Sequence, residues 1–225
     1  PLTTTINSAT SATATIPNTL LANPGSANIT YVSAAGITSN ALAFSITGNP
    51  VIETINPPFR NVGSGAFTLT VTGSGFVNGS TVFFNGQART TTFVNSGQLT
   101  AQILANDLAT AGVVPVLVNS AGENSQPVSF EVLTPLTISS LNPSSANAGS
   151  AGFNLTVNGT GFESGNTVLW NGQARTTTFV SATQMTAAIT AGDIATAGSF
   201  PVTVSARFSR VSNAAHFAVN QPGSL

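Results

Sequence analysis

A nine-residue phrase that occurs twice places the strongest constraint on what this chain can fold into. Residues 85–93 return letter for letter as residues 171–179, a shift of roughly 86 positions. The shift holds without a gap from residues 54–118 onto 140–204, and roughly 38 of 65 aligned positions are identical. Such self-similarity is typical of a modular array. Most residues are therefore expected to serve a repeated module rather than one unique site.

Within the repeat, apolar and polar residues alternate as they do in β-strands. Every second residue of 67–72 is apolar, and residues 153–158 repeat the alternation. The Asn-Gly pairs at 85–86 and 171–172 follow such runs and predict type I′ hairpins, which need positive φ at both central residues. The phrase Arg-Thr-Thr-Thr-Phe that follows, residues 89–93 in the middle copy, is predicted to be the return strand.

Two matching segments between strands predict one short helical turn in each copy. They begin at Asp107 and Asp193, which we expect to cap the turn, and they end at Gly112 and Gly198. About seven short strands separated by glycine-rich turns predict an all-β fold of tandem immunoglobulin-like sandwiches.

The first 47 residues follow the back half of the same module. Residues 3–10 align with 176–183, and Leu21 aligns with Leu108, so Pro1 falls just past the position of the Asn-Gly hairpin. We expect a rod-like chain with a truncated first module, continued upstream in the native protein. The predicted domains are the C-terminal half of a module at 1–47 and full modules at 52–133 and 138–219. Half a sandwich exposes its inner face, so residues 1–47 are expected to pair with another chain or to be poorly ordered.

The composition excludes several function classes. Charged residues make up 5% of the chain, against about 25% in ordinary soluble domains, and the net charge is −1. A neutral chain without lysine favours neither a nucleic-acid partner nor an anionic membrane, and no apolar run is long enough for direct membrane insertion. The absence of cysteine excludes disulfides. The Thr-, Ser- and Asn-rich surface favours an exported bacterial protein, extracellular or in the cell envelope.

The start of each full module carries a family resemblance. Ile55-Asn-Pro57 followed by residues 63–76, and Leu141-Asn-Pro143 followed by residues 149–162, resemble the opening of an IPT/TIG domain. The Asn-Pro, Gly-Ser and Gly-x-Gly-Phe elements stand at that family's spacing. The family is immunoglobulin-like and includes plexins, Rel-type transcription factors and many bacterial surface proteins. The resemblance implies tandem modules of a bacterial envelope or secreted protein, which serve as spacers, dimerisers or binding modules.

No residue pattern indicates an enzyme, a cofactor or a metal site. Asp107 and Asp193 occupy one position in two modules, so capping accounts for them better than a shared acid–base pair. His216, the single histidine, is expected to lie solvated on the outer face of the last strand rather than to activate a serine. No Asp, Glu or His cluster suggests metal binding, although a calcium site built from carbonyl groups stays open.

Three repeated or substituted positions have a structural and a functional interpretation. Arg89 and Arg175 are expected to bond backbone carbonyls or a neighbouring module rather than a ligand. Trp170 replaces Phe84 at an inward position, which favours a core role over stacking on a sugar.

The residues that the copies do not share point to a candidate ligand or partner loop. The last hairpin of the third copy carries Arg207, Phe208 and Arg210, where the second copy has Ala121-Gly-Glu-Asn124 and the first has Ala34-Ala-Gly-Ile37. End loops are where immunoglobulin-like folds usually bind, and Arg and aromatic residues are favoured in binding hot spots. The alternative is that this loop contacts the next module or nothing.

Three functions follow from these features. The first is a non-enzymatic structural spacer or display stalk within a longer cell-surface or secreted chain, with neighbouring modules as its partners. The second is a glycan- or protein-recognition module, active in adhesion, that uses end loops. The third is an accessory domain of a polysaccharide-active enzyme.

Overall fold

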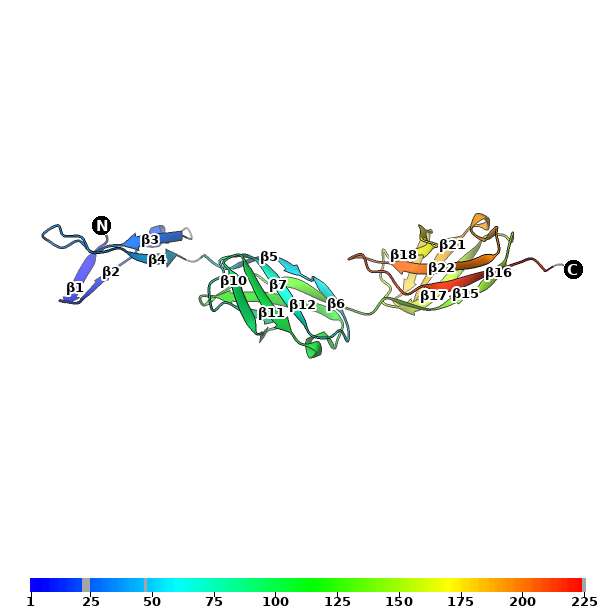
Figure 1. The fold of residues 1–225 in the computed structure, drawn as a ribbon, viewed down its shortest axis with the longest axis horizontal. Helices are drawn as coiled ribbons and strands as arrows, with labels where there is room; N and C mark the ends of the chain where they lie inside the picture. Colours follow the sequence, from blue (N-terminus) through cyan, green and yellow to red (C-terminus); the bar gives the residue numbers. More distant parts are fainter. Residues whose placement is uncertain (22–24, 47, 224–225) are drawn as a thin grey trace. The chain divides into compact units, whose positions relative to one another are not determined.

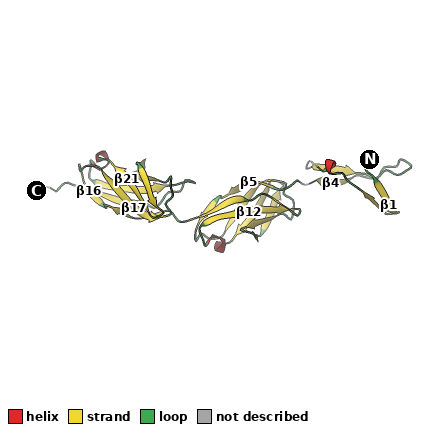
Figure 2. Cartoon of the chain, turned by 180° about the vertical axis from the view of Figure 1, so that it is seen from behind, coloured by secondary structure: helices red, strands yellow, loops and turns green. Residues whose placement is uncertain are grey.

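The chain folds into β-structure throughout, and helix is confined to short turns (Figure 2). The computed structural model describes residues 1–21, 25–46 and 48–223, so the predicted boundary at residue 47 lies outside the described residues. The all-β, tandem immunoglobulin-like fold predicted from the repeat is confirmed.

The second copy is a sandwich of two sheets. One sheet has the strand order β10-β11-β7-β5, and the other has the order β6-β14-β12-β8-β9 with β13 paired to β12. Figure 1 labels β5, β6, β7, β10, β11 and β12 of this copy. Its elements are β5 (Val51–Asn56), β6 (Phe59–Asn61), β7 (Phe67–Ser74), β8 (Thr81–Phe84), β9 (Gln87–Ala88), β10 (Thr91–Asn95), β11 (Gln98–Ile103), the 3-10 turn η2 (Ala105–Leu108), β12 (Gly112–Ser120), β13 (Glu123–Asn124) and β14 (Val128–Leu133).

The third copy repeats this topology with the orders β15-β17-β21-β20 and β16-β23-β22-β18-β19. Most of its pairs are antiparallel, but β16 runs parallel to β23, as β6 does to β14. Its elements are β15 (Thr137–Asn142), β16 (Ser145–Asn147), β17 (Phe153–Thr160), β18 (Thr167–Trp170), β19 (Gln173–Ala174), β20 (Thr177–Ser181), β21 (Gln184–Ile189), η3 (Ala191–Ile194), β22 (Gly198–Ser205) and β23 (Ala215–Asn220).

The first copy consists of two separate two-stranded sheets. Its elements are β1 (Thr4–Ser8), β2 (Ser11–Ala14), the 3-10 turn η1 (Asn18–Leu20), β3 (Gly25–Ile29) and β4 (Leu42–Ile46). β1 pairs with β2, and β3 pairs with β4. Every strand residue of this copy is exposed except Ile46, which is half-buried. These strands therefore have no inner face that is shielded from water within the described residues.

Each sandwich packs its alternating apolar residues into a core between the two sheets. In the third copy Leu155, Val157 and Phe217 are fully buried, and Trp170 retains 2% of its exposure. The Trp170 ring stacks on Phe200 with centroids 5.5 Å apart and lies 5.1 Å from Phe217. The predicted core role of Trp170 is confirmed.

The Asn-Gly turns adopt the predicted backbone, but the return strand was placed wrongly. Asn85 and Gly86 have φ values of 51° and 74°, as a type I′ turn requires. The strand that returns along β8 is only the two-residue β9, and the chain then leaves this sheet. The next strand, β10, pairs with β11 in the other sheet. The repeated phrase therefore holds a hairpin turn and a crossing between sheets.

The predicted helical turns are present, but they begin two residues before the expected Asp107 and Asp193. In η3 the N-cap residue is Thr190, whose hydroxyl accepts from the Asp193 backbone amide, while the Asp193 carboxylate accepts from the Thr190 amide. Asp193 is therefore the third residue of a capping box and not the cap itself. Gly198 begins the next strand instead of closing the turn.

The Gly-x-Gly-Phe element is explained by a close backbone approach. A Cβ on Gly73 would lie 1.9 Å from the Val51 carbonyl oxygen, and Gly75 has a φ of 75°. Phe76, which closes the element, is buried at 2% exposure. The element thus lets β7 approach β5 and inserts an aromatic ring into the core, which is why both copies carry it.

The substitution Gly73→Ala should destabilise the second copy because a methyl group has no room beside the Val51 carbonyl. Overpacking of this kind costs about 1–3 kcal/mol, which urea unfolding followed by circular dichroism would resolve. Gly65→Ala is the matched control, since a Cβ at Gly65 meets nothing within 4 Å. Equal unfolding midpoints for the two variants would contradict this account of the glycine.

Candidate functional site

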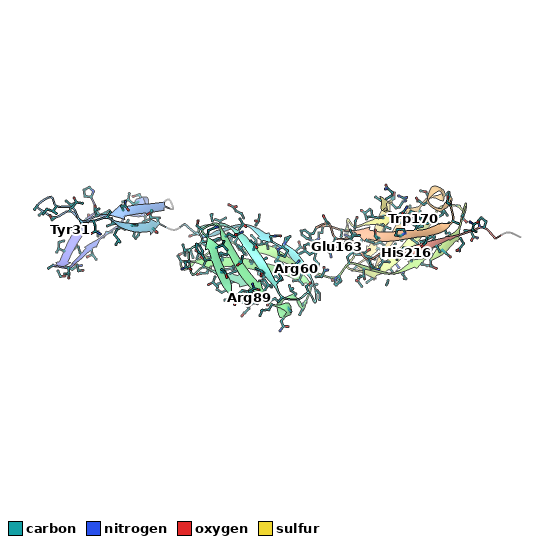
Figure 3. All side chains as sticks on the ribbon, in the orientation of Figure 1. Tyr31, Arg60, Arg89, Glu163, Trp170 and His216 are labelled. Atoms are coloured by element: carbon teal, nitrogen blue, oxygen red, sulfur yellow. The ribbon has the colours of Figure 1, made fainter. Side chains whose placement is uncertain are left out.

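The two arginines of the repeated phrase each clamp an aspartate of the same copy. Arg175 Nε donates to Asp193 Oδ2 at 2.8 Å, and its Nη2 donates to Asp193 Oδ1. Arg89 and Asp107 form the same two-pronged pair, with Nε to Oδ2 at 2.9 Å. Arg89, labelled in Figure 3, follows the short strand β9, whereas Asp107 lies on η2. The pair therefore ties the sheet crossing to the 3-10 turn.

The clamp also draws in neighbouring backbone groups and is largely removed from water. Arg175 Nη1 donates to the carbonyls of Ala174 and Gln173 at 2.9 and 3.2 Å. The side chains of Arg175 and Asp193 retain 19% and 9% of their exposure. The Arg175 hydrogen bond, aided by the Thr190 amide, lowers the pKa of Asp193, and the same bond raises the pKa of Arg175. Bonding of Arg to backbone carbonyls, as predicted, is confirmed, and the aspartate is the stronger partner.

The motifs alone do not reveal this clamp, although the first copy carries a sequence signal for it. In the first copy Leu2 stands at the position of Arg175 and Leu20 at that of Asp193. Both charged partners are thus replaced together by leucine, and Leu2 and Leu20 line one groove. Paired replacement across repeats is the pattern expected of two residues in contact.

The candidate loop of the third copy is held by ion pairs. Arg207 binds Glu131 through two bonds, Nη1 to Oε1 and Nη2 to Oε2, both 2.5 Å long, and its Nε donates to Glu163 at 2.9 Å. Arg210 donates to Glu163 and to the Thr134 carbonyl, both at 3.3 Å. The Arg210 side chain is 7% exposed, whereas that of Arg207 is 44% exposed. The bonds to Glu131 and then Glu163 raise the pKa of Arg207.

An aromatic pair accompanies these charges. Phe208 stacks on Phe59 with ring centroids 4.8 Å apart and an interplanar angle of 17°. The guanidinium carbons of Arg207 and Arg210 lie 5.1 Å from the Phe208 centroid and 5.9 Å from the Phe59 centroid, within cation–π range. Phe208 and Ser209 reach this geometry with φ values of 58° and 55°.

All members of this loop cluster belong to one compact unit. That unit comprises Phe59–Ser64, Leu108–Gly112 and Glu131–Leu225. The structure places Arg207, Phe208 and Arg210 side by side on this loop, and their role toward a ligand or partner stays a prediction. It also adds Phe59, Glu131 and Glu163, which the search for motifs did not connect with them. Their contribution could not be found from spacing because about 76 residues separate Glu131 from Arg207.

The remaining candidates for chemistry do not converge. His216, labelled on β23 in Figure 3, lies on an exposed position, and its Nδ1 is 3.2 Å from the Ser199 hydroxyl. Its hydrogen-bond partner among the described residues is this hydroxyl and not a carboxylate that would orient the imidazole. The described part of the chain contains no group of three His, Cys, Asp or Glu side chains placed to hold a metal ion. It also contains no helix that is long and apolar enough to cross a membrane.

Comparison with protein families identifies both full copies. The model of the IPT/TIG domain matches residues 50–132 and again residues 136–219. Among curated proteins the chain has no match.

Several solved structures resemble this chain, which spans less than two thirds of each. The plexin A4 extracellular region has 20% identity and a TM-score of 0.39 over 77% of this chain and 16% of that one. The Yersinia pseudotuberculosis adhesin InvE has 18% identity and a TM-score of 0.29 over 76% and 58%. The Bacteroides ovatus mixed-linkage glucan utilization protein SGBP-B, solved with a heptasaccharide, has 16% identity and a TM-score of 0.34 over 88% and 53%.

The single substitutions Arg175→Leu and Asp193→Leu should each destabilise the third copy by about 1.5–3 kcal/mol, because each leaves a poorly solvated charge without its partner. The double variant, which reproduces the Leu2 and Leu20 pair of the first copy, should cost clearly less than the sum of the two. Urea unfolding of all four proteins measures this difference. Strict additivity would show that the clamp contributes no coupling energy.

Acid should weaken the clamp. The pKa of Asp193 is lower in the folded protein than its ordinary value near 3.9, so its stabilisation is present above about pH 4 and is lost as pH falls through the folded pKa. Between pH 6 and pH 2 the midpoint temperature of thermal unfolding should therefore fall more steeply for the parent chain than for the double-leucine variant. Parallel curves would contradict the assigned direction of the shift.

Proposed function

This chain belongs to the IPT/TIG domain family, and from that premise we propose that it is a non-enzymatic structural array that spaces or displays other parts of a larger exported protein. Its partners in this role are neighbouring modules of the same longer chain. We place that protein outside the cell or in the bacterial envelope, because its surface is neutral and rich in Thr, Ser and Asn. IPT/TIG and immunoglobulin-like folds are typically non-catalytic modules.

The use of the few charged side chains is the observation that carries this proposal. Four arginines, at positions 89, 175, 207 and 210, pair with carboxylates of the same compact unit. An active site or a charged-ligand site would instead direct such groups into a cleft, where a substrate or ligand could reach them. Here the charges stabilise turns and hairpins. A surface with little net charge offers no long-range attraction for an ionic partner.

A spacer needs domains that stay folded on their own, and the two sandwiches have the features that this requires. Each sandwich has its own buried core, so each can remain folded while its ends are joined to other domains. Trp170, the single tryptophan, lies in that core and offers no exposed platform for a sugar ring.

Recognition of a glycan or a protein is the second candidate, and one observation favours it. Phe208 remains 41% exposed although it stacks on Phe59, and the Arg207 side chain above it is 44% exposed. An exposed aromatic ring beside an arginine matches the composition of binding hot spots. This candidate places the ligand at the loop of residues 207–210.

A glycan array probed with the whole chain separates the two functions. The structural role predicts no glycan signal above that of a control protein without this module. It also predicts that Arg207→Ala lowers the free energy of unfolding by up to about 1 kcal/mol, as expected for a partly exposed ion pair.

The recognition role predicts a different result for the same proteins. A defined glycan would bind the parent chain, and Phe208→Ala would abolish binding while lowering the free energy of unfolding only by the worth of its stacking on Phe59, about 0.5–1.5 kcal/mol. Val113→Ala, a change at an exposed apolar position outside the loop, is the matched control and should retain the parent behaviour under both functions.

A further inference from the structure

The first copy exposes the residues that the other two copies bury. Ile29 is 43% exposed, whereas Val116 and Val202 at the aligned positions have no exposure. Phe44 is 36% exposed, whereas Phe130 and Phe217 at the aligned positions have none. The aligned strands have the same hydrophobic pattern, so the difference arises from what covers them.

In the second copy the strands that pair with β11 and β12 are known, together with the register of each pair. On β11, Leu99 lies opposite Val71 of β7, and Ala101 lies opposite Leu69. The third copy repeats this arrangement between β21 and β17, and pairs β22 with β18 as β12 pairs with β8. These covering strands all come from the leading half of the module, which in the second copy is residues 50–87.

The first copy has an apolar groove that is lined in part by β3 and β4. Ile16, Leu21, Ile29, Phe44 and Ile46 line it, together with Leu2 and Leu20, and its volume is about 280 Å³. The residues that stand at the positions of the Arg–Asp clamp thus contribute leucine to this groove. The groove is suited to apolar side chains, since no charged side chain is among its described lining residues.

The strand edges of the first copy are also available. Among the described residues β2 pairs only with β1, and β3 pairs only with β4, so one edge of β2 and one of β3 are open. An open edge presents unpaired backbone N–H and C=O groups that can bind an added strand. In the second and third copies the equivalent edges hold β7 or β17 and β8 or β18.

We propose that residues 1–21 and 25–46 are a docking surface for the leading half of an IPT/TIG module, which binds by adding one strand to β2 and another to β3. The register follows from the second copy. Donor residues equivalent to Val71 and Leu69 lie opposite Ala12 and Ala14. Those equivalent to Phe84 and Val82 lie opposite Ile29 and Tyr31.

Charge and shape favour this occupant over a second copy of the same surface. Residues 1–46 contain no Asp, Glu, Lys or Arg, and neither do residues 61–87, so docking of a leading half buries no charge at these strands. Two first-copy surfaces would instead bring Ala12 and Ala14 of one chain against the same small residues of the other. The groove would then lack the large apolar side chains that fill its equivalent in the complete sandwiches. The proposal does not depend on the spacer role.

The test mixes the whole chain with a separate polypeptide that has the sequence of residues 50–87. Hydrogen exchange followed by mass spectrometry should show at least about tenfold slower exchange in residues 4–14 and 25–46 at a 1:1 ratio. Exchange in residues 52–219 should not change. A polypeptide with Leu69→Asp and Val71→Asp is the matched control and should give no protection.

A second measurement tests the proposal even if the separate polypeptide is insoluble. Joining residues 50–87 ahead of Pro1 should add a third cooperative unfolding transition to the chain. The absence of protection in the mixture together with no added transition in the joined chain would overturn the proposal. Equal protection by the control polypeptide would also overturn it. Protection that appears without polypeptide and rises with chain concentration would assign the surface to a second copy instead.

Discussion

The seam between the leading and trailing halves of each module is the interaction on which the rest of the structure depends. Where β7 lies against β11 and β8 against β12, the apolar residues between the sheets are removed from water. Burial of such side chains is worth about 1.5–3 kcal/mol each, and each sandwich buries many of them. Where the leading strands are not present, as in residues 1–46, the same pattern of residues forms only two exposed hairpins. The hydrophobic alternation is therefore necessary for the sandwich but does not by itself produce one.

The few charged residues hold segments of the chain that the apolar core does not fix. A chain with 5% charged residues could place them anywhere on its surface, yet the arginines at 89 and 175 lie at the sheet crossing, where the backbone leaves one sheet for the other. Arg207 and Arg210 likewise hold a hairpin with left-handed backbone at Phe208. In both places the guanidinium group joins segments that no sheet hydrogen bond connects. This distribution supports the structural role that we propose for the charged residues.

The candidate site could be predicted from the sequence only in part. Arg207, Phe208 and Arg210 stand out because they depart from the repeat, and they do lie together. Their partners Phe59 and Glu131 could not be found, since both lie far away in sequence. The Arg–Asp clamp could have been found, because Leu2 and Leu20 replace both partners in the first copy. The boundaries of the return strand and of the helical turn were wrong, because hydrogen-bond partners rather than local residue preferences decide where the chain changes sheets.

The sequence by itself determined the module: its length, its alternating strands, its Asn-Gly turns and its family. These features depend on local backbone preference and on hydrophobic period, both of which are written in consecutive residues. Only the tertiary structure decided which sheet each strand joins, why Gly73 must be glycine, and which carboxylates the arginines bind. It also decided that the apolar face of residues 1–46 is uncovered within the described residues. Contacts of this kind join segments tens of residues apart, and their energy depends on a geometry that no single segment contains.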